Sequence, residues 1–471
     1  MRSEIVVVGG GAGGLELACK LGRKLGPAKV MLVDSRLYHI WKPSLHEVAA
    51  GTLDIHQEGL SYQMLAHDNG FTYVYGAMTA LDATARRIAI APVTTPAGEE
   101  VLPARTIEYA KLVLAVGSTS NYFGVPGAAE NTVSLNATED AEQFRLKLLR
   151  LMAMADLSRN GADPAGVPAA FEVEADAALP ATATVLAARP AALAPVQARS
   201  AGKSSVDIVI IGGGATGVEL AAELREASSA YANYGFEHLD AVRDVHLTIL
   251  EGADRILSPL PQKVSDAALS LLKQRAISVH TSCRVTRIDA GQVIDASGAA
   301  YPADLCVWAA GIRAPQWLSG LGLPTARGGQ LEVDDHLRVK GVPGVYALGD
   351  CAACIDAKGK PVPPRAQAAH QQADYLLHAF VREVQGRAPS PKGYLYADYG
   401  SLVSIGNTTS VGSLMGALQG FNWFVEGVFA RMMYLSLHLM HHRAVMGTLR
   451  TGLLALARFL IRRTTPLVKL H

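Results

Sequence analysis

The chain has 471 residues, a formal net charge of +1 at pH 7 and a sequence pI of about 7.7. This length predicts two or three domains with ample core, and the balanced charge argues against a nucleic-acid-binding protein. Five scattered cysteines, an odd number, and a first predicted strand that begins by Glu4 indicate a reducing cytoplasmic setting without a signal peptide.

A glycine-rich turn follows the first apolar run. Gly9, Gly11 and Gly14 form the pattern G-x-G-x-x-G between this run and a helix-forming segment. The first glycine permits a tight turn, the second lets a pyrophosphate approach the backbone, and the third lets helix and strand pack closely. Asp34 follows about 20 residues later, at the end of the next predicted strand, where a carboxylate accepts hydrogen bonds from a ribose. The stretch predicts a dinucleotide-binding α/β unit.

Residues 38–51, YHIWKPSLHEVAAG, come after this strand end. Disulfide-reducing flavoenzymes carry a cysteine pair at about this place, and the stretch contains no cysteine, which argues against a dithiol relay. Lys42, Pro43 and His46 are candidates to line a flavin, although a lone Lys or His in an apolar segment is more often structural.

Two later strands run into glycine turns. Residues 111–121, KLVLAVGSTSN, contain Gly117, and residues 305–314, LCVWAAGIRA, contain Gly311. The repeated arrangement predicts that two units close in the same way, and both turns are candidates for cofactor binding.

Residues 160–205 lie between these strands and are dense in Ala and Pro. They show no sustained period of either 2 or 3.6, so the composition predicts a flexible insertion or linker outside the sheet. A partner-binding arm is the alternative.

A second glycine-rich turn, in residues 206–222, repeats the opening of the chain almost residue for residue. Its glycines are Gly212, Gly214 and Gly217, and Glu251 ends the next predicted strand after a longer spacing. A carboxylate there repels the extra phosphate of NADP, which predicts NADH over NADPH; a solvated strand-end carboxylate is the alternative in both copies. Two dinucleotide sites on one chain indicate a nicotinamide that brings a hydride and a flavin that receives it.

Residues 342–354, VPGVYALGDCAAC, form a short predicted strand with a turn after it. Asp350 is a candidate to meet the ribityl chain or pyrophosphate of a flavin, and a turn-forming Asp is the alternative. Cys351 and Cys354 lack the context of a thioredoxin motif and are interpreted as core thiols. No second CxxC offers a zinc site, so no metal site is expected.

Two prolines precede the run RAQAAHQQA and predict the start of a helix. Gln367 and Gln371 are four residues apart and share one face of that helix. Their amides suit the two carbonyls of a quinone, although spacing alone favours surface glutamines.

The last part of the chain changes character twice. Residues 401–425 carry no charge but are interrupted by Gly, Ser, Thr and Asn, which predicts strands and turns and not a membrane span. Residues 427–471 contain seven Lys or Arg and no Asp or Glu, with Leu449, Leu453, Leu456 and Leu460 at helical spacing. The pattern favours cationic, amphipathic helices on an anionic lipid surface, with a helix docked on the protein or on a dimer partner as the alternative.

Several motifs together resemble one family. WKPSLHEVAAG, LAVGSTSN, GGGATGVEL, WAAGI, YALGDCAAC and PPRAQAAHQQA, in this order, are similar to the type II NADH dehydrogenases, the non-pumping respiratory NADH:quinone oxidoreductases, in their proteobacterial form. The resemblance covers nearly the whole chain, and residues 160–205 depart from it because the family is much shorter there.

The resemblance implies two Rossmann-like domains and a C-terminal membrane-associating region. Residues 1–120 and 320–395 are then the two parts of an FAD-binding domain, residues 121–319 an NADH-binding domain, and residues 396–471 strands and membrane-binding helices. It implies a peripheral protein, often dimeric, on the cytoplasmic face of the bacterial inner membrane.

The resemblance also implies a site for quinone. It falls near Gln367 and Gln371, and Glu219 matches the acidic residue that the family places at the flavin and quinone site. From the sequence alone, Glu219 is equally a helix-start carboxylate that complements the helix dipole.

Two alternatives stay open for the function. One is an enzyme of the same fold with another partner, a sulfide:quinone or ferredoxin-type reductase. A sulfide:quinone reductase needs cysteines beside the flavin, and only the closely spaced Cys351 and Cys354 are candidates. The other is a flavin-bearing scaffold that binds NADH to control association.

Overall fold

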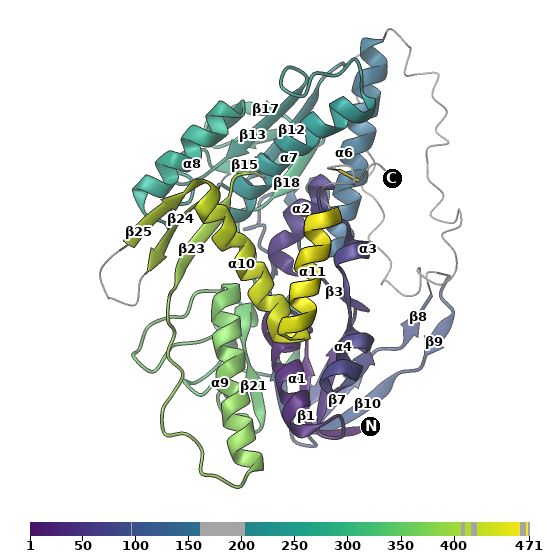
Figure 1. The fold of residues 1–471 in the computed structure, drawn as a ribbon, viewed down its shortest axis with the longest axis vertical. Coiled ribbons are helices and arrows are strands. Elements are labelled where there is room, and N and C mark those ends of the chain that lie inside the picture. Colours follow the sequence, from purple (N-terminus) through teal and green to yellow (C-terminus); the bar gives the residue numbers. More distant parts are fainter. Residues whose placement is uncertain (96, 161–202, 407–409, 416–421, 462–467, 470–471) are drawn as a thin grey trace.

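The computed structural model describes every residue except 96, 161–202, 407–409, 416–421, 462–467 and 470–471. Most of the insertion expected at residues 160–205 therefore lies outside the described residues. The rest forms an α/β protein, as the sequence predicts, with two main sheets whose central strands run parallel (Figure 1).

The first sheet is built around the opening strand of the chain. Its order is β5-β2-β1-β10-β7-β6, and β21 pairs with β10. The strands β5, β2, β1, β10 and β21 run parallel, whereas β7 and β6 form an antiparallel extension. The strands are β1 (Arg2–Val8), β2 (Val30–Asp34), β5 (Thr72–Tyr75), β6 (Met78–Asp82), β7 (Arg87–Ile90), β10 (Arg105–Leu114) and β21 (Val345–Ala347). Because β21 lies late in the sequence, the chain leaves this sheet after β10 and returns to it.

The second sheet holds four parallel strands in the order β14-β13-β12-β18. They are β12 (Val206–Ile211), β13 (Val245–Leu250), β14 (Ile277–His280) and β18 (Leu305–Trp308). The described residues also form six smaller sheets, of which two matter for the site. One is the pair β11 (Thr119–Ser120) and β19 (Ile312–Arg313), and the other is the antiparallel sheet of β23 (Gly400–Ser404), β24 (Ser410–Met415) and β25 (Asn422–Glu426). The other short strands are β3 (Tyr38–His39), β4 (Leu60–Ser61), β8 (Val93–Thr94), β9 (Glu100–Leu102), β15 (Val285–Asp289), β16 (Gln292–Asp295), β17 (Ala300–Pro302), β20 (Leu331–Glu332) and β22 (Ala352–Ala353).

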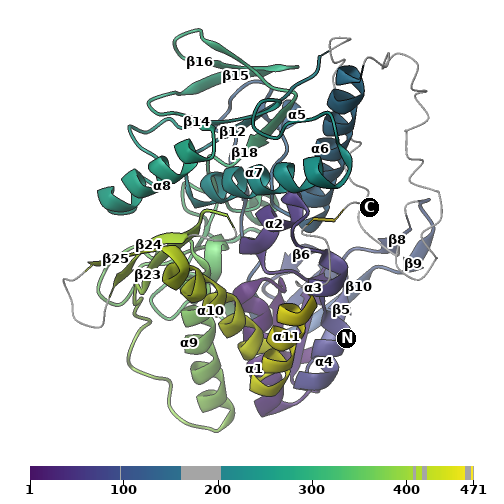
Figure 2. The ribbon, with the colours of Figure 1, turned by 45° about the horizontal axis from the view of Figure 1, so that its top comes forward.

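Helices cover both sheets, and Figures 1 and 2 show the two units one above the other. The unit with α7 and α8 lies at the top of both views, and the unit with α1 and α9 at the bottom. The helices are α1 (Ala12–Leu25), α2 (Leu45–Ala50), α3 (Ile55–Glu58), α4 (Tyr62–Asn69), α5 (Ala128–Asn131), α6 (Thr138–Arg159), α7 (Ala215–Gly235), α8 (Gln262–Gln274), α9 (Ala366–Val384), α10 (Gly427–Met446) and α11 (Thr448–Ile461).

The two glycine turns have the same geometry. Gly9 has φ 102° and Gly212 has φ 110°, in the left-handed region that favours glycine. A Cβ on Gly14 would overlap the carbonyl oxygen of Gly9, and a Cβ on Gly217 would overlap that of Gly212. The third glycine is thus required so that each helix can start directly against the turn before it.

The hydrophobic core links the two units. One cluster of buried side chains contains Leu45 and Val48 of α2, Phe144 of α6 and Val218 of α7. Helix α2 belongs to the first half of the chain, yet it is packed into the core beneath the second sheet. The two units are therefore fixed to each other by apolar packing as well as by the β11–β19 pair.

The C-terminal region forms three strands and then two helices. The three-stranded sheet and the helix pair α10–α11 match the strands, turns and helices predicted for this part of the chain. Helix α10 contacts α1 and α4 of the lower unit (Figure 1). Within the described residues, no helix has both the length and the apolar character needed to cross a bilayer.

Candidate active site

The first glycine turn faces open space at its middle residue. A Cβ on Gly11 would have its nearest neighbour, the carbonyl oxygen of Ala115, only at 4.0 Å. The turn is closed from the other side, where the Gly10 carbonyl accepts a hydrogen bond of 2.8 Å from the Tyr62 hydroxyl. Asp34 lies beside it and accepts from the backbone N–H of Gly10 at 2.6 Å. Burial raises the pKa of this carboxyl, and the two backbone N–H groups that bind it oppose the shift.

The second turn repeats this arrangement. A Cβ on Gly214 would meet nothing within 4 Å. Glu251 accepts hydrogen bonds from the backbone N–H groups of Gly213 at 2.5 Å and Ala253 at 2.7 Å. Each turn therefore combines a helix N-terminus, an open middle glycine and a strand-end carboxylate, which is the donor and acceptor set that a dinucleotide requires.

Three residues from separate segments meet beside the first turn. The Lys42 ammonium donates to the Ser118 carbonyl oxygen at 2.9 Å, and the Ser118 hydroxyl donates to an Asp350 carboxylate oxygen at 2.7 Å. Burial lowers the pKa of Lys42, and the negative charge of Asp350 opposes the shift. The structure thus brings together Lys42, the turn after Gly117 and Asp350, which the sequence identified separately. Ser118, the residue that joins them, was missed because nothing in a Gly-Ser-Thr turn singles out one hydroxyl.

The turns at Gly117 and Gly311 also come together. Thr119 pairs with Arg313 across β11 and β19, and the N–H of Asn121 donates to the Gly311 carbonyl at 3.0 Å. Because each turn closes the carboxyl edge of its own sheet, this pairing joins the two edges at which ligands of such sheets bind.

Gln367 and Gln371 lie on the first turns of α9 and share the face that the sequence predicts. Both side-chain amides bind the segment at residues 397–400. Gln367 donates to the Gly400 carbonyl at 3.1 Å, and Gln371 donates to the Ala397 carbonyl at 2.8 Å and accepts from its N–H at 2.9 Å. The same segment continues into β23.

Glu219 is buried on α7 and meets the far end of β23. Its carboxylate accepts from the N–H of Ser404 at 3.0 Å, and a ring nitrogen of His46 lies 3.9 Å away. One helical turn further on, Glu223 accepts from the Thr52 hydroxyl at 2.5 Å. Burial and, after it, repulsion from Glu47 raise the pKa of Glu223. Glu219 and the two glutamines, which come from distant parts of the sequence, are therefore connected through one stretch, residues 397–404.

The cysteines are buried and have no disulfide bonds. Burial raises the pKa of Cys351 to about 11 and that of Cys354 to about 12. Both residues belong to the core of the first unit, as their interpretation as core thiols predicts. Thiols held protonated in this way are poor nucleophiles, which disfavours a sulfide or dithiol relay.

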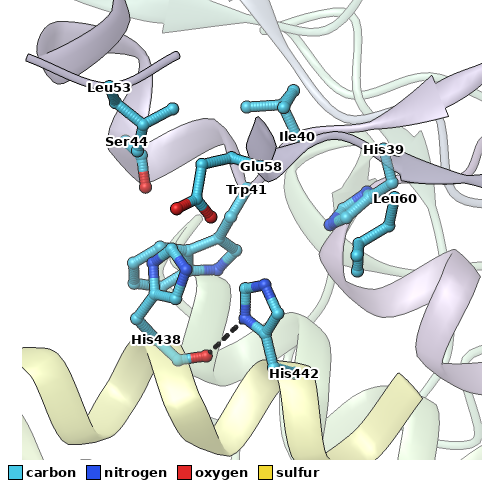
Figure 3. A pocket seen from close by; sticks show the side chains of 9 residues that line it. All are labelled: His39, Ile40, Trp41, Ser44, Leu53, Glu58, Leu60, His438 and His442. Carbon is cyan, nitrogen blue, oxygen red and sulfur yellow. Dashed lines mark hydrogen bonds between the residues drawn. The ribbon is translucent and has the colours of Figure 1, made fainter. Parts of the chain in front are cut away.

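A pocket that the sequence did not reveal lies between α10 and the segment at residues 39–60 (Figure 3). The Glu58 carboxylate and the rings of His438 and His442 point into it, beside the Trp41 ring. The two rings stack at 4.4 Å between centroids. The signal in the sequence was the run HLMHH, which places several histidines on one side of a helix.

Comparisons with known proteins agree with this geometry. Residues 3–373 match the model of the family described as pyridine nucleotide-disulphide oxidoreductase. The type II NADH:quinone oxidoreductase of Haemophilus influenzae is 37% identical over 99% of this chain and all of its own length. The type II NADH:quinone oxidoreductase Ndh of Mycobacterium tuberculosis is 24% identical over 93% of this chain and 84% of its own.

Solved structures show the same fold. NDH2 from Plasmodium falciparum, in complex with NADH, superposes with a TM-score of 0.75 over the whole of both chains at 18% identity. The sulfide:quinone oxidoreductase from Aquifex aeolicus gives a TM-score of 0.65 over 95% of this chain and 92% of its own at 16% identity. At these identities the superpositions establish the architecture, whereas the sequence match over the full length establishes the family. The chain therefore belongs to the type II NADH:quinone oxidoreductases, within the pyridine nucleotide-disulphide oxidoreductase family.

Proposed function

We propose that this protein oxidises NADH and reduces a membrane quinone through bound FAD, without pumping protons. The observation that carries the proposal is the pair of equivalent glycine turns, each open at its middle glycine and flanked by a carboxylate. FAD, when bound, accepts two electrons from NADH as a hydride and delivers them to a quinone, which also takes up two protons. The balance is one NADH, one proton and one quinone to one NAD⁺ and one quinol.

The first turn would hold FAD and the second NADH. Gly9, Gly11 and Gly14 admit the pyrophosphate of FAD at the N-terminus of α1, and Asp34 binds its ribose. The hydrogen-bonded set of Lys42, Ser118 and Asp350 holds the remainder of the same ligand. Its position next to Gly117 supports this role, since a ligand at the first turn extends along this edge of the sheet.

The NADH site would use Gly212, Gly214, Gly217 and Glu251. The β11–β19 pair, next to Gly311, joins the carboxyl edges of the two sheets, at which the two glycine turns lie. This arrangement supports a direct hydride transfer from NADH to the flavin.

The quinone would bind where residues 397–404 pass between α9 and α7. Gln367 and Gln371 fix one end of this stretch by hydrogen bonds, and Glu219 fixes the other. In this proposal the glutamines position the quinone, and Glu219 delivers protons to it. Glu223, whose pKa burial raises, is a nearby carboxyl from which Glu219 regains a proton.

The quinone is a lipid, so the protein would bind the surface of a membrane, on its cytoplasmic side. Support comes from α10 and α11, where the described part of the chain exposes eight large apolar side chains: Met432, Leu435, Leu437, Met440, Leu449, Leu453, Leu456 and Leu460. Leu449 is 78% exposed and Leu453 60%. Such side chains are suited to insertion into the headgroup boundary of a bilayer. In the alternative arrangement they would be covered by a second copy of the chain in a dimer interface.

The reaction is tested by an anaerobic visible spectrum of the purified protein. NADH is expected to bleach a flavin band, and a soluble quinone added next is expected to restore it. A bleached band that quinone fails to restore would favour another acceptor or an NADH-sensing role, and a fully loaded protein without a flavin band would contradict the assignment of the first turn.

Glu251→Arg is expected to move the preference from NADH toward NADPH. The substitution replaces a repelling carboxylate by a cation that attracts the 2′-phosphate, so the NADPH/NADH ratio of kcat/KM should rise by about tenfold or more, equivalent to ~1.4 kcal/mol. Glu237→Arg, at an exposed residue with the same charge change, is the control and should leave the ratio unchanged. An unchanged ratio in Glu251→Arg removes Glu251 from the site.

Glu219→Gln is expected to slow reoxidation of the flavin by quinone about 100-fold, because the amide can still accept from Ser404 but carries no titratable proton. Bleaching by NADH, followed in a stopped-flow instrument, should keep its rate.

The double variant Gln367→Leu/Gln371→Leu should instead raise the KM for quinone, because it frees residues 397–400. Quinone kinetics untouched in both variants would show that these residues have no role.

Leu453→Glu/Leu456→Glu is expected to lower sedimentation of the protein with anionic lipid vesicles at least tenfold, because charge on the apolar face opposes insertion. Leu146→Glu on α6, which is 54% exposed, is the matched control. Equal vesicle binding by the unaltered protein, the double variant and the control would assign the leucines to a protein contact. In that case size-exclusion chromatography should show a dimer for the unaltered protein that is lost in the double variant.

A further inference from the structure

A group of ionisable side chains beneath α10 has no part in the proposed reaction. Glu16 from α1, His370 from α9 and His441 from α10 each place one possible ligand atom within 4.8 Å of the others. Glu16 and His441 are buried, at 3% and 1% exposure. The three residues come from separate elements, so they meet only in the folded protein.

The hydrogen bonds of His39 determine where His441 carries its proton. His39 Nδ1 lies 2.9 Å from the carbonyl oxygen of Gly10, which can only accept, so Nδ1 of His39 is protonated. Its Nε2 then has a lone pair and must accept from the Nε2 of His441, 2.8 Å away. The remaining nitrogen of His441, Nδ1, keeps a lone pair.

That nitrogen is buried and has no hydrogen-bond partner among the described residues. A buried polar atom without a partner destabilises the folded protein, so a ligand at this nitrogen would be stabilising. A neutral imidazole whose other nitrogen is fixed by a hydrogen bond is the form in which histidine binds metals.

The other two residues supply the remaining ligands. One carboxylate oxygen of Glu16 is hydrogen-bonded by a ring nitrogen of His370, and the other is paired with Lys20 at 2.5 Å. Lys20 is also paired with Asp374 at 2.5 Å and keeps this partner if Glu16 turns to a cation. The side chain of His370 is 27% exposed, which leaves a path to the solvent.

A neighbouring group of the same composition provides a contrast. Glu58, His438 and His442 also place ligand atoms within 4.8 Å of one another, around the pocket of Figure 3. There the guanidinium of Arg458 is ion-paired with Glu58 and lies 3.5 Å from Nε2 of His442. That group already holds a fixed cation, whereas in the described part of the chain the cation paired with Glu16 is Lys20, which is shared with Asp374.

We propose that Glu16, His370 and His441 bind one divalent transition-metal ion of the zinc class, with His39 holding His441 in its binding orientation. Two imidazoles and one carboxylate are a ligand set for zinc that leaves a fourth position for water. Nitrogen ligands exclude Mg²⁺ and Ca²⁺, which bind oxygen. The ion connects α10 to α1 and α9 and thereby fastens the C-terminal helices to the first unit.

The test is a titration of the flavin-loaded, full-length protein with Zn²⁺ in competition with a chelating dye. One ion should bind, should not be displaced by millimolar Mg²⁺ or Ca²⁺, and should raise the Tm. His441→Gln and Glu16→Gln should each lower the affinity more than about 100-fold, and His39→Ala about 10- to 100-fold. His438→Gln, in the neighbouring group, is the matched control and should leave the affinity unchanged.

The flavin content and the rate of bleaching by NADH show whether each variant is folded. If His441→Gln fails to fold, the zinc affinity of Glu16→Gln decides the test. X-ray absorption at the zinc edge should give nitrogen and oxygen ligands with imidazole scattering. Equal affinity in Glu16→Gln and the unaltered protein, loss of binding in His438→Gln, or sulfur among the ligands would each overturn the proposal. These results do not depend on which acceptor oxidises the flavin.

Discussion

Close contact between backbone and backbone at the two glycine turns is the constraint on which the rest of the structure depends. At each turn the helix starts so near the preceding carbonyl that only glycine fits at the third position. The same approach leaves the N-terminus of the helix uncovered at the middle glycine. A side chain at any of these positions would either separate helix from strand or fill the space in which we propose that a pyrophosphate binds. Packing and ligand binding therefore impose the same sequence, which explains why the pattern occurs twice.

The two turns are useful for a common reaction only because the units are fixed to each other. The β11–β19 pair joins the carboxyl edges of the two sheets, and α2 carries apolar side chains of the first unit into the core of the second. The stretch at residues 397–404 then spans from α9 to Glu219 on α7. A ligand at this stretch would contact both units, which is the arrangement that an electron acceptor in a two-substrate flavoenzyme needs.

The C-terminal helices have two different sides. Leucines and methionines of α10 and α11 are exposed, whereas His441 and His442 on α10 are buried against the first unit. Burial, followed by the charges of neighbouring histidines, lowers the pKa of His441 well below its usual value, so this imidazole is neutral near pH 7. The surface that we propose to insert into lipid is thus attached to the first unit through imidazoles, which the proposed ion would cross-link.

The sequence by itself determined the α/β class, the two glycine turns with Asp34 and Glu251 beside them, the helix that begins at Ala366 and the change to a cationic, amphipathic end. These features are local, because glycine spacing, strand hydrophobicity and helical period act over a few turns of chain. Only the tertiary structure decided that Lys42, Ser118 and Asp350 meet, that Gln367 and Gln371 bind the segment before β23, and that Glu16, His370 and His441 converge. Such contacts join residues that lie between 26 and 354 positions apart, so the short-range periodicity of the sequence does not reveal which side chains will meet.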